Sequence, residues 1–259
     1  MKIEEHEIDV NKIIDVAKAA GDKILEIYNK ESFDRQLKTD NSPLTEADIV
    51  SHNLITQLLK NITPTIPIIS EESSTILWKE RRQYKCYWLI DPLDGTKEFI
   101  KKNGEFTVNI ALIYKHEPIL GVVHAPVLNE TWIGEKGKLS KKIEKGNARI
   151  IKVKQHKQGE VHKVVGSRSH AGDSLNEFLK ELEKYELVSM GSSIKLCLVA
   201  EGKAHLYPRL GPTSEWDTAA AHAVVNAAGG KVINNETQMP LQYNTKDSLR
   251  NPHFIVQPN

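Results

Sequence analysis

The sequence predicts an α/β protein, organised as a layered α+β sandwich in which helices alternate with sheets. Two stretches with apolar residues at helical spacing begin the chain, and short apolar runs separated by turns follow them. In the second half, expected strands and helices alternate, which is typical of α/β layering. The length of 259 residues and the hydrophobic content of 39% suit one large domain or two closely packed subdomains.

The first half is expected to place two helices on a largely antiparallel sheet. Asp9 is a plausible N-cap for an amphipathic helix over residues 9–30. Thr45 can cap a second helix, with Glu46 and Asp48 in the first turn, where the helix dipole favours negative charge. The strands expected here span residues 64–70, 87–90, 106–114, 119–125 and 130–135.

The second half is expected to alternate strands with helices. The expected strands span residues 161–165, 187–190, 204–207, 231–233 and 254–256. The expected helices span residues 173–184, 192–201 and 217–228. We therefore place a subdomain boundary near residue 150, with an α+β subdomain over residues 1–150 and an α/β subdomain over residues 151–259.

The overall composition excludes several classes of protein. The net charge of +1 gives no general attraction for nucleic acid. No apolar run approaches the roughly 20 residues that a membrane span needs, and the acidic N-terminus does not resemble a signal peptide. Cys86 and Cys197 lie in apolar runs and are interpreted as core residues rather than as disulfide or zinc residues. A cytoplasmic protein fits these features best.

Positive charge is concentrated in one lysine-rich segment, residues 136–158. It has few aromatic residues, so it lacks the stacking platform that single-strand nucleic-acid binders use. We interpret the lysines of this region as part of a solvated loop and strand edge: Lys141, Lys142, Lys145, Lys152, Lys154 and Lys157.

Residues suited to chemistry concentrate where one apolar strand ends. Residues 87–90 indicate a buried strand that breaks at Asp91-Pro92, and Asp94-Gly95 indicates a turn. Two carboxylates would then lie at the strand end, with the carbonyl of Leu93 between them and the hydroxyl of Thr96 just after. Mg²⁺ takes oxygen ligands of these kinds. Taken alone, the stretch is explained equally well as an ordinary polar turn.

Further acids lie where other expected elements begin or end, namely Asp48, Glu71, Glu72 and Asp217. Each has a simpler interpretation, because Asp217 could be the N-cap of the helix that it opens and Glu71-Glu72 could be a surface pair. Unpaired carboxylates that lie close together repel one another, so a joint cluster predicts bound cations. Oxygen-only ligands favour Mg²⁺ over zinc or copper.

These motifs resemble the inositol monophosphatase superfamily of Mg²⁺-dependent, lithium-sensitive phosphatases. The resemblance rests on Glu71-Glu72-Ser73, residues 88–96 and Trp216-Asp217, and on the spacing of twenty from Glu71 to Asp91. It runs from about residue 10 to the end of the chain and implies the alternating helix and sheet layers of that superfamily. Within it, the chain is most similar to bacterial 3′(2′),5′-bisphosphate nucleotidases, at residues 97–100, 103–110, 166–170, 191–195 and 208–217.

The resemblance implies a catalytic site that holds two or three Mg²⁺ ions. The implied metal ligands are the carboxylates of Glu71, Asp91, Asp94 and Asp217 and the carbonyl of Leu93. Thr96 would orient the attacking water, Asp48 would accept the proton of Thr96, and Glu71 would also take part in catalysis. Glu72 is expected to lie outside the metal ligands. The residues expected to contact substrate are Glu71, Leu93, Asp94, Gly95, Thr96, His170, Ser192, Lys195, Arg209 and Asp217.

The implied activity is hydrolysis of the 3′-phosphate of 3′-phosphoadenosine 5′-phosphate (PAP) to AMP and phosphate, in sulfate assimilation or nucleotide recycling. Residues 1–150 would then bind metal, and residues 151–259 would set substrate specificity within one continuous catalytic domain. The expected partner is the nucleoside bisphosphate, with no stable nucleic-acid partner. A monomer and a homodimer stay open, as does peripheral association with the cytoplasmic face of the inner membrane.

Two other functions stay open. The first is an inositol monophosphatase or another small sugar-phosphate phosphatase, with the same metals and a different pocket. Lys97-Glu98-Phe99 argues against it, because inositol monophosphatases typically have Thr-Asn-Phe there. The second is a non-catalytic regulatory or RNA-binding protein of this fold, which is less favoured because all the metal carboxylates are present.

Overall fold

A seven-stranded sheet forms the centre of the molecule. The computed structural model describes residues 1–32, 34–37, 43–73, 76–167 and 173–259. The strands lie in the order β11-β10-β9-β8-β7-β6-β5, and every neighbouring pair is antiparallel except β5 and β6. Their bounds are β5 Ile68–Ser70, β6 Cys86–Asp94, β7 Thr107–Tyr114, β8 Glu117–Ala125, β9 Glu130–Glu135, β10 Lys141–Glu144 and β11 Asn147–Ile150.

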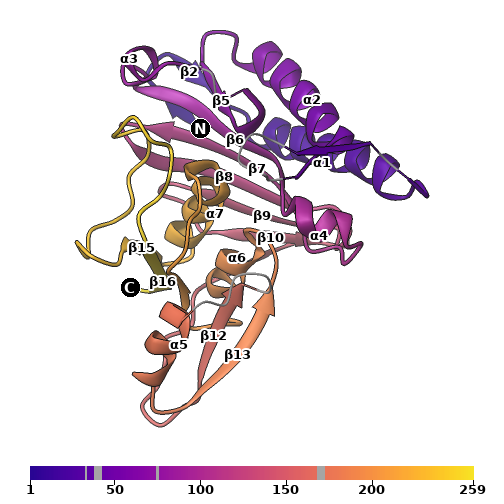
Figure 1. Cartoon of the computed structure of the whole chain (residues 1–259). Helices are drawn as coiled ribbons and strands as arrows, with labels where there is room; N and C mark the ends of the chain where they lie inside the picture. The colour runs from indigo at the N-terminus through magenta and orange to yellow at the C-terminus, as the bar shows by residue number, and fades with distance from the viewer. Residues whose placement is uncertain (33, 38–42, 74–75, 168–172) are drawn as a thin grey trace.

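Helices cover both faces of this sheet (Figure 1). Trp88 and Ile90 of β6 pack with α1 (Val10–Tyr28) and α2 (Glu46–Ile62) in one core. Tyr87 and Leu89 pack with α6 (Ile194–Ala200) and α7 (Glu215–Ala227) in the other core. Successive side chains of a strand point to opposite faces, so one apolar strand supplies both cores. The predicted layered α/β fold is confirmed.

Two glycines bring α7 unusually close to the sheet. A Cβ on Gly121 of β8 would lie 2.0 Å from the carbonyl oxygen of Ala220, and one on Gly134 of β9 would lie 2.3 Å from that of Ala223. Only a residue without a side chain leaves room for the helix backbone there. This packing fixes the position of α7, whose first turn carries Asp217.

The second half adds two smaller sheets. β12 (His162–Ser167) and β13 (Tyr185–Met190) are parallel and are connected through α5 (Asp173–Lys180). The other sheet has the order β14-β16-β15, with β14 Tyr207–Arg209, β15 Gly230–Asn234 and β16 Phe254–Pro258. The remaining short elements are β1 Lys2–Ile3, β2 His6–Glu7, β3 Arg35–Leu37, β4 Pro43–Thr45, η1 Glu71–Ser73, α3 Trp78–Arg81 and α4 Thr96–Ile100.

Two predictions about local structure were wrong. The helix expected from residue 217 begins at Glu215, because Ser214 is its N-cap and Asp217 is the third residue of the helix. The strand expected to break at Asp91-Pro92 continues to Asp94 through a bulge. Proline is tolerated at a bulge because the ladder hydrogen bond that it cannot donate is already lost there.

Lys142 also differs from its expected place on a solvated edge. It is fully buried on β10, and its ammonium lies 2.7 Å from the carboxylate of Glu130 and 3.3 Å from that of Glu201. It also lies 4.9 Å from the ring centroid of Trp132, its cross-strand neighbour. The two carboxylates and the aromatic face compensate the cation for the loss of water.

Neither cysteine forms a disulfide, in agreement with the sequence: Cys197 is buried and Cys86 is half-buried. Within the described ranges, no helix has the length and apolar character needed to cross a membrane.

Candidate active site

The bulge in β6 sets the direction of two predicted site residues. In the ladder with β7, Asp91 pairs with Asn109 and Asp94 pairs with Thr107, so β6 holds one extra residue between these pairs. A bulge of this kind bends the strand and re-aims its side chains. Oδ1 of Asp91 accepts a hydrogen bond from the backbone N–H of Leu93 at 3.0 Å, which holds this carboxylate against the bulge.

Glu71 lies beside Asp91 because their two strands run parallel in a fixed register. Ile68 pairs with Trp88 and Ser70 pairs with Ile90, so partners are twenty positions apart. Glu71 and Asp91 continue this register, because 91 − 71 is also 20. The spacing of twenty in the sequence is therefore the register of the β5–β6 ladder.

The N-termini of α2 and α7 supply two further carboxylates, and each of these carboxylates is held by the same kind of hydrogen bond. The carboxylate of Asp48, the third residue of α2, accepts from the backbone N–H of the N-cap Thr45 at 2.8 Å. The carboxylate of Asp217, the third residue of α7, accepts from the N–H of the N-cap Ser214 at 2.8 Å. These are capping boxes, which satisfy helix-terminal donors and hold the acid in place. The other oxygen of Asp48 accepts from the hydroxyl of Thr96 at 3.3 Å.

Three predicted metal ligands meet in one cluster. Glu71, Asp91 and Asp217 each place one carboxylate oxygen so that these oxygens lie within 4.8 Å of one another. Asp94 lies next to them, in the same pocket as Glu71 and Asp217. Oxygen atoms alone make up this set, which fits a hard divalent cation.

The acids of this cluster are held in an environment that disfavours their charge. Burial raises the pKa of Asp91 well above its usual range, and the neighbouring carboxylates of Glu71, Asp94 and Asp217 raise it further. Burial, followed by the charges of Asp94 and Glu71, raises the pKa of Asp217 to about 8. Burial also raises the pKa of Asp94 to about 6, although the ammonium of Lys195 opposes that shift. The site is therefore electrostatically incomplete without added positive charge.

A pocket of about 210 Å³ opens above this cluster. Of the predicted site residues, eight line it, namely Glu71, Asp94, Gly95, Thr96, Ser192, Lys195, Arg209 and Asp217. Asp48, Asp91 and Leu93 are buried and do not line it. Gly95 has a φ of +97°, and a Cβ there would lie 3.2 Å from the carbonyl oxygen of Glu105. The turn between Asp94 and α4 therefore requires glycine.

Two cationic side chains, Lys195 and Arg209, line the same pocket as the acids. The ammonium of Lys195 donates to the Ser192 carbonyl at 2.5 Å, and burial lowers its pKa to about 8 although Asp94 opposes the shift. The guanidinium of Arg209 donates to the Pro212 carbonyl at 2.7 Å, while its buried Nε has no hydrogen-bond partner among the described residues. His170 lies outside the described residues.

Comparison with known proteins agrees with this geometry. The family model described as Inositol monophosphatase family matches residues 7–256. The chain belongs to the inositol monophosphatase family. This membership confirms the resemblance seen in the sequence and agrees with the layered fold.

Two curated relatives in the family are named "3'(2'),5'-bisphosphate nucleotidase CysQ". The protein from Shigella flexneri is 48% identical over 248 residues, covering 95% of this chain and 98% of its own length. The protein from Haemophilus influenzae is 35% identical over 250 residues, covering 95% and 91%. The crystal structure of CysQ from Bacteroides thetaiotaomicron has a TM-score of 0.85 and 41% identity, covering 96% of this chain and 97% of that one.

In this inositol monophosphatase-family site, Asp94 is held by residues whose role the sequence did not indicate. Oδ2 of Asp94 accepts from the backbone N–H of Ser193 at 2.6 Å and from the side-chain amide of Asn109 at 3.3 Å. The hydroxyl of Ser193 donates to the Asn109 carbonyl oxygen at 2.8 Å and lies 2.9 Å from the Thr107 hydroxyl. Asn109 and Ser193 both belong to motifs that carried the resemblance, but nothing local indicated their contact with Asp94.

Proposed function

We propose that this chain is a Mg²⁺-dependent 3′(2′),5′-bisphosphate nucleotidase that converts PAP to AMP and phosphate. The carboxylate cluster of Glu71, Asp91 and Asp217, beside the Thr96–Asp48 hydrogen bond, is the observation that carries the proposal. The relative from Shigella flexneri, named for this activity and matching at 48% identity over nearly its full length, supports the substrate class.

The cation set that we propose is two or three Mg²⁺ ions. The ligands would be the carboxylates of Glu71, Asp91, Asp94 and Asp217 and the carbonyl of Leu93. Bound Mg²⁺ supplies neutralisation of the phosphoryl charge and activation of a water molecule. The raised pKa values of Asp91, Asp94 and Asp217 support the assignment, because bound cations would favour the charged carboxylates that burial and mutual repulsion disfavour.

Thr96 and Asp48 are the proposed water-orienting pair. Thr96 donates its hydroxyl proton to Asp48, so the lone pairs of its oxygen are directed elsewhere and can accept a hydrogen bond from the attacking water. The capping box of α2 fixes Asp48, which in turn fixes the rotamer of Thr96. Positioning of this kind is a large part of catalysis in phosphoryl transfer.

The second phosphate of the substrate is assigned to the cationic side of the pocket, which Lys195 and Arg209 form. Lys195 and Arg209 would contact it, together with the hydroxyl of Ser192 and the side chain of His170. We propose accordingly that residues 1–150 supply most of the metal ligands and residues 151–259 supply specificity. The protein is proposed to act in the cytoplasm as a monomer or homodimer. Peripheral membrane association has no support in the described part of the chain.

A phosphate-release panel tests the function. It would compare PAP, its 2′ isomer, 3′-phosphoadenosine 5′-phosphosulfate and inositol 1-phosphate. Each compound would be tested with Mg²⁺ and with EDTA. We expect the bisphosphates to be hydrolysed fastest and release to stop in EDTA. A preference for inositol 1-phosphate would instead establish the sugar-phosphate alternative, and no release from any ester would establish a non-catalytic protein.

A further inference from the structure

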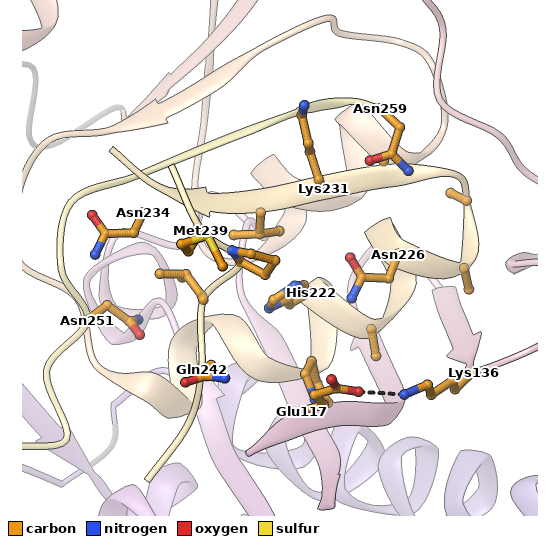
Figure 2. A pocket seen from close by; sticks show the side chains of 18 of the residues that line it. Glu117, Lys136, His222, Asn226, Lys231, Asn234, Met239, Gln242, Asn251 and Asn259 are labelled. Carbon is orange, nitrogen blue, oxygen red and sulfur yellow. Dashed lines mark hydrogen bonds and ion pairs between the residues drawn. The ribbon is translucent and has the colours of Figure 1, made fainter. Parts of the chain in front are cut away.

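A cavity of about 1300 Å³ lies beside α7 and β15, away from the acid cluster. Figure 2 shows side chains of His222, Asn234, Met239 and Asn251 gathered around it. Small-molecule sites commonly occupy about 300–1,000 Å³, so a ligand the size of a nucleotide fits. Nothing in the proposed phosphatase chemistry uses this space.

The charges that line the cavity favour an anion. Three of its lining cations make no side-chain hydrogen bond or salt bridge within the described ranges: Lys152, Lys231 and Arg250. A fourth, Lys246, lies close enough to Glu215 to oppose the rise that burial causes in the pKa of that carboxyl. The lining acids are already engaged. Glu117 pairs with Lys136 at 2.5 Å, and the buried carboxylate of Glu215 accepts from the Asn244 N–H at 2.7 Å. Several free cations around one cavity are suited to phosphate groups.

The other lining groups favour a flat heterocycle over a simple anion. Five amide side chains line the wall, namely Asn226, Asn234, Gln242, Asn251 and Asn259. Amides of this kind hydrogen-bond the donor and acceptor pattern of a nucleobase edge. The cavity is also lined by Met239 and Pro240, whose exposed side chains offer an apolar surface against which a base could pack.

We propose that this cavity is an effector site for a nucleoside polyphosphate. The phosphates would lie on the three free cations, and the base would pack on the apolar and amide wall. The inference is independent of which phosphate ester the acid cluster hydrolyses.

The structure provides a direct connection from this cavity to the acid cluster. The amide of Asn251 donates to the Ser214 carbonyl at 2.7 Å and to the Thr218 hydroxyl at 3.0 Å. The N–H of Ser214 in turn holds the carboxylate of Asp217 at 2.8 Å. Asn251 therefore lines the effector cavity and also fixes the first turn of α7. A ligand that orders Asn251 stabilises the capping box of Asp217, which is a coupling between two distinct sites.

Calorimetric titration with ADP in EDTA tests binding. Metal-free conditions are chosen because phosphate binding beside the acid cluster is proposed to depend on Mg²⁺. We expect the double variant Lys231→Gln/Arg250→Gln to weaken ADP binding at least tenfold. The control Lys85→Gln/Lys145→Gln removes two exposed lysines elsewhere and should stay within twofold of wild type. Adenosine and tripolyphosphate, each carrying half of the recognition, should bind at least tenfold more weakly than ADP.

Two outcomes would overturn the effector site. One is no detectable ADP binding by the wild-type protein. The other is binding that survives Lys231→Gln/Arg250→Gln but is lost in Arg209→Gln, which would place ADP in the catalytic pocket.

Amide hydrogen exchange tests the coupling. ADP should slow exchange in peptides that cover residues 213–218 of the wild-type protein. In Asn251→Ala, measured at an ADP concentration that saturates the variant in the calorimetric titration, this protection should disappear. Equal protection in both proteins would refute the coupling through Asn251.

Discussion

Asp48 and Asp217 occupy the same position in two helices that belong to different halves of the chain. Each is the third residue after an N-cap hydroxyl residue, and each accepts the backbone N–H of that residue at 2.8 Å. The capping box is normally a device of helix stability. Here it also holds two acids beside the same site, so a stability motif positions functional groups.

The α7 capping box stabilises the helix and also holds Asp217 at the site, and mutation can separate these two roles. Ser214→Ala removes the cap hydroxyl but keeps the backbone N–H, so we expect a loss of about 1 kcal/mol and largely retained turnover at saturating Mg²⁺. Asp217→Asn should abolish most activity. Its metal-free melting temperature should not fall as a result of losing the charge, because burial and neighbouring acids already disfavour that charge. Calorimetry in EDTA measures the change in stability, and a phosphate-release assay measures the change in activity. Full activity in Asp217→Asn would contradict the assignment of Asp217 as a metal ligand.

Asp94→Asn should remove most activity while the fold stays intact. Loss of a partner outside the metal ligands typically costs about 10–100-fold, and loss of a ligand charge should cost more. Ser193→Ala is the matched control, because the backbone N–H that holds Asp94 remains and the loss should stay below about tenfold. Near-normal phosphate release by Asp94→Asn with Mg²⁺ present would exclude Asp94 as a ligand.

Thr96→Val should lower kcat with little change in KM. The substitution keeps the shape of the side chain but removes the hydroxyl that donates to Asp48. General acid–base catalysis contributes typically about 10²–10⁴-fold, and we expect a loss in that range. Thr96→Ser restores the hydroxyl and should recover most of the rate. If the valine and serine variants have the same steady-state kcat, the hydroxyl has no catalytic role.

Arg209→Ala should raise KM for PAP more than KM for adenosine 3′-phosphate. A hydrogen bond to a charged group contributes about 1.5–3 kcal/mol, which corresponds to about tenfold or more in affinity. Only PAP has the 5′-phosphate that Arg209 is proposed to contact. An equal rise in KM for both substrates would assign Arg209 a structural role instead.

His222 should make the protein less stable in mild acid. Burial lowers the pKa of His222 to about 3, whereas the unfolded chain has the ordinary histidine value near 6.5. The unfolded chain therefore binds a proton that the folded chain excludes, and this contribution to stability falls as pH decreases from about 6.5 toward 3, by at most about 1.4 kcal/mol per pH unit.

The measurement for His222 is the melting temperature between pH 7.5 and pH 5. His222→Gln keeps a polar group near the Tyr243 hydroxyl, which lies 2.9 Å from Nδ1 of His222, but does not titrate. The variant should lose less stability than the wild type over this range. Parallel pH profiles for the two proteins would show that His222 does not contribute.

Local patterns in the sequence predicted much of the architecture. Helical periodicity and Asp9 predicted α1, whose N-cap side chain accepts from the Asn11 N–H at 3.0 Å. Short apolar runs bounded by turns predicted β5 to β9 of the central sheet. The sequence did not predict α3 or α4, because helices of four and five residues are too short for periodicity to show.

The candidate site was predicted at the level of residue types rather than geometry. The twenty-residue spacing between Glu71 and Asp91 carried real structural information, because it equals the register of a parallel strand pair. The prediction that the helix begins at Asp217 was wrong. In sequence, an acid at the N-cap and an acid at the third helical position differ by only a few residues, so the pattern does not separate them. The burial of Lys142 was also missed, because its carboxylate partner Glu201 lies 59 positions away.

The sequence by itself determined the longer helices, most strands of the central sheet, the set of acids and the family to which the chain belongs. These follow from side-chain periodicity and from motifs that span a few residues. Only the tertiary structure decided which oxygens meet. Ser193 reaches Asp94 across 99 positions, and Asn251 reaches Ser214 across 37. Contacts of this range depend on how α6 and α7 pack on the sheet, and that packing leaves no local pattern in the chain.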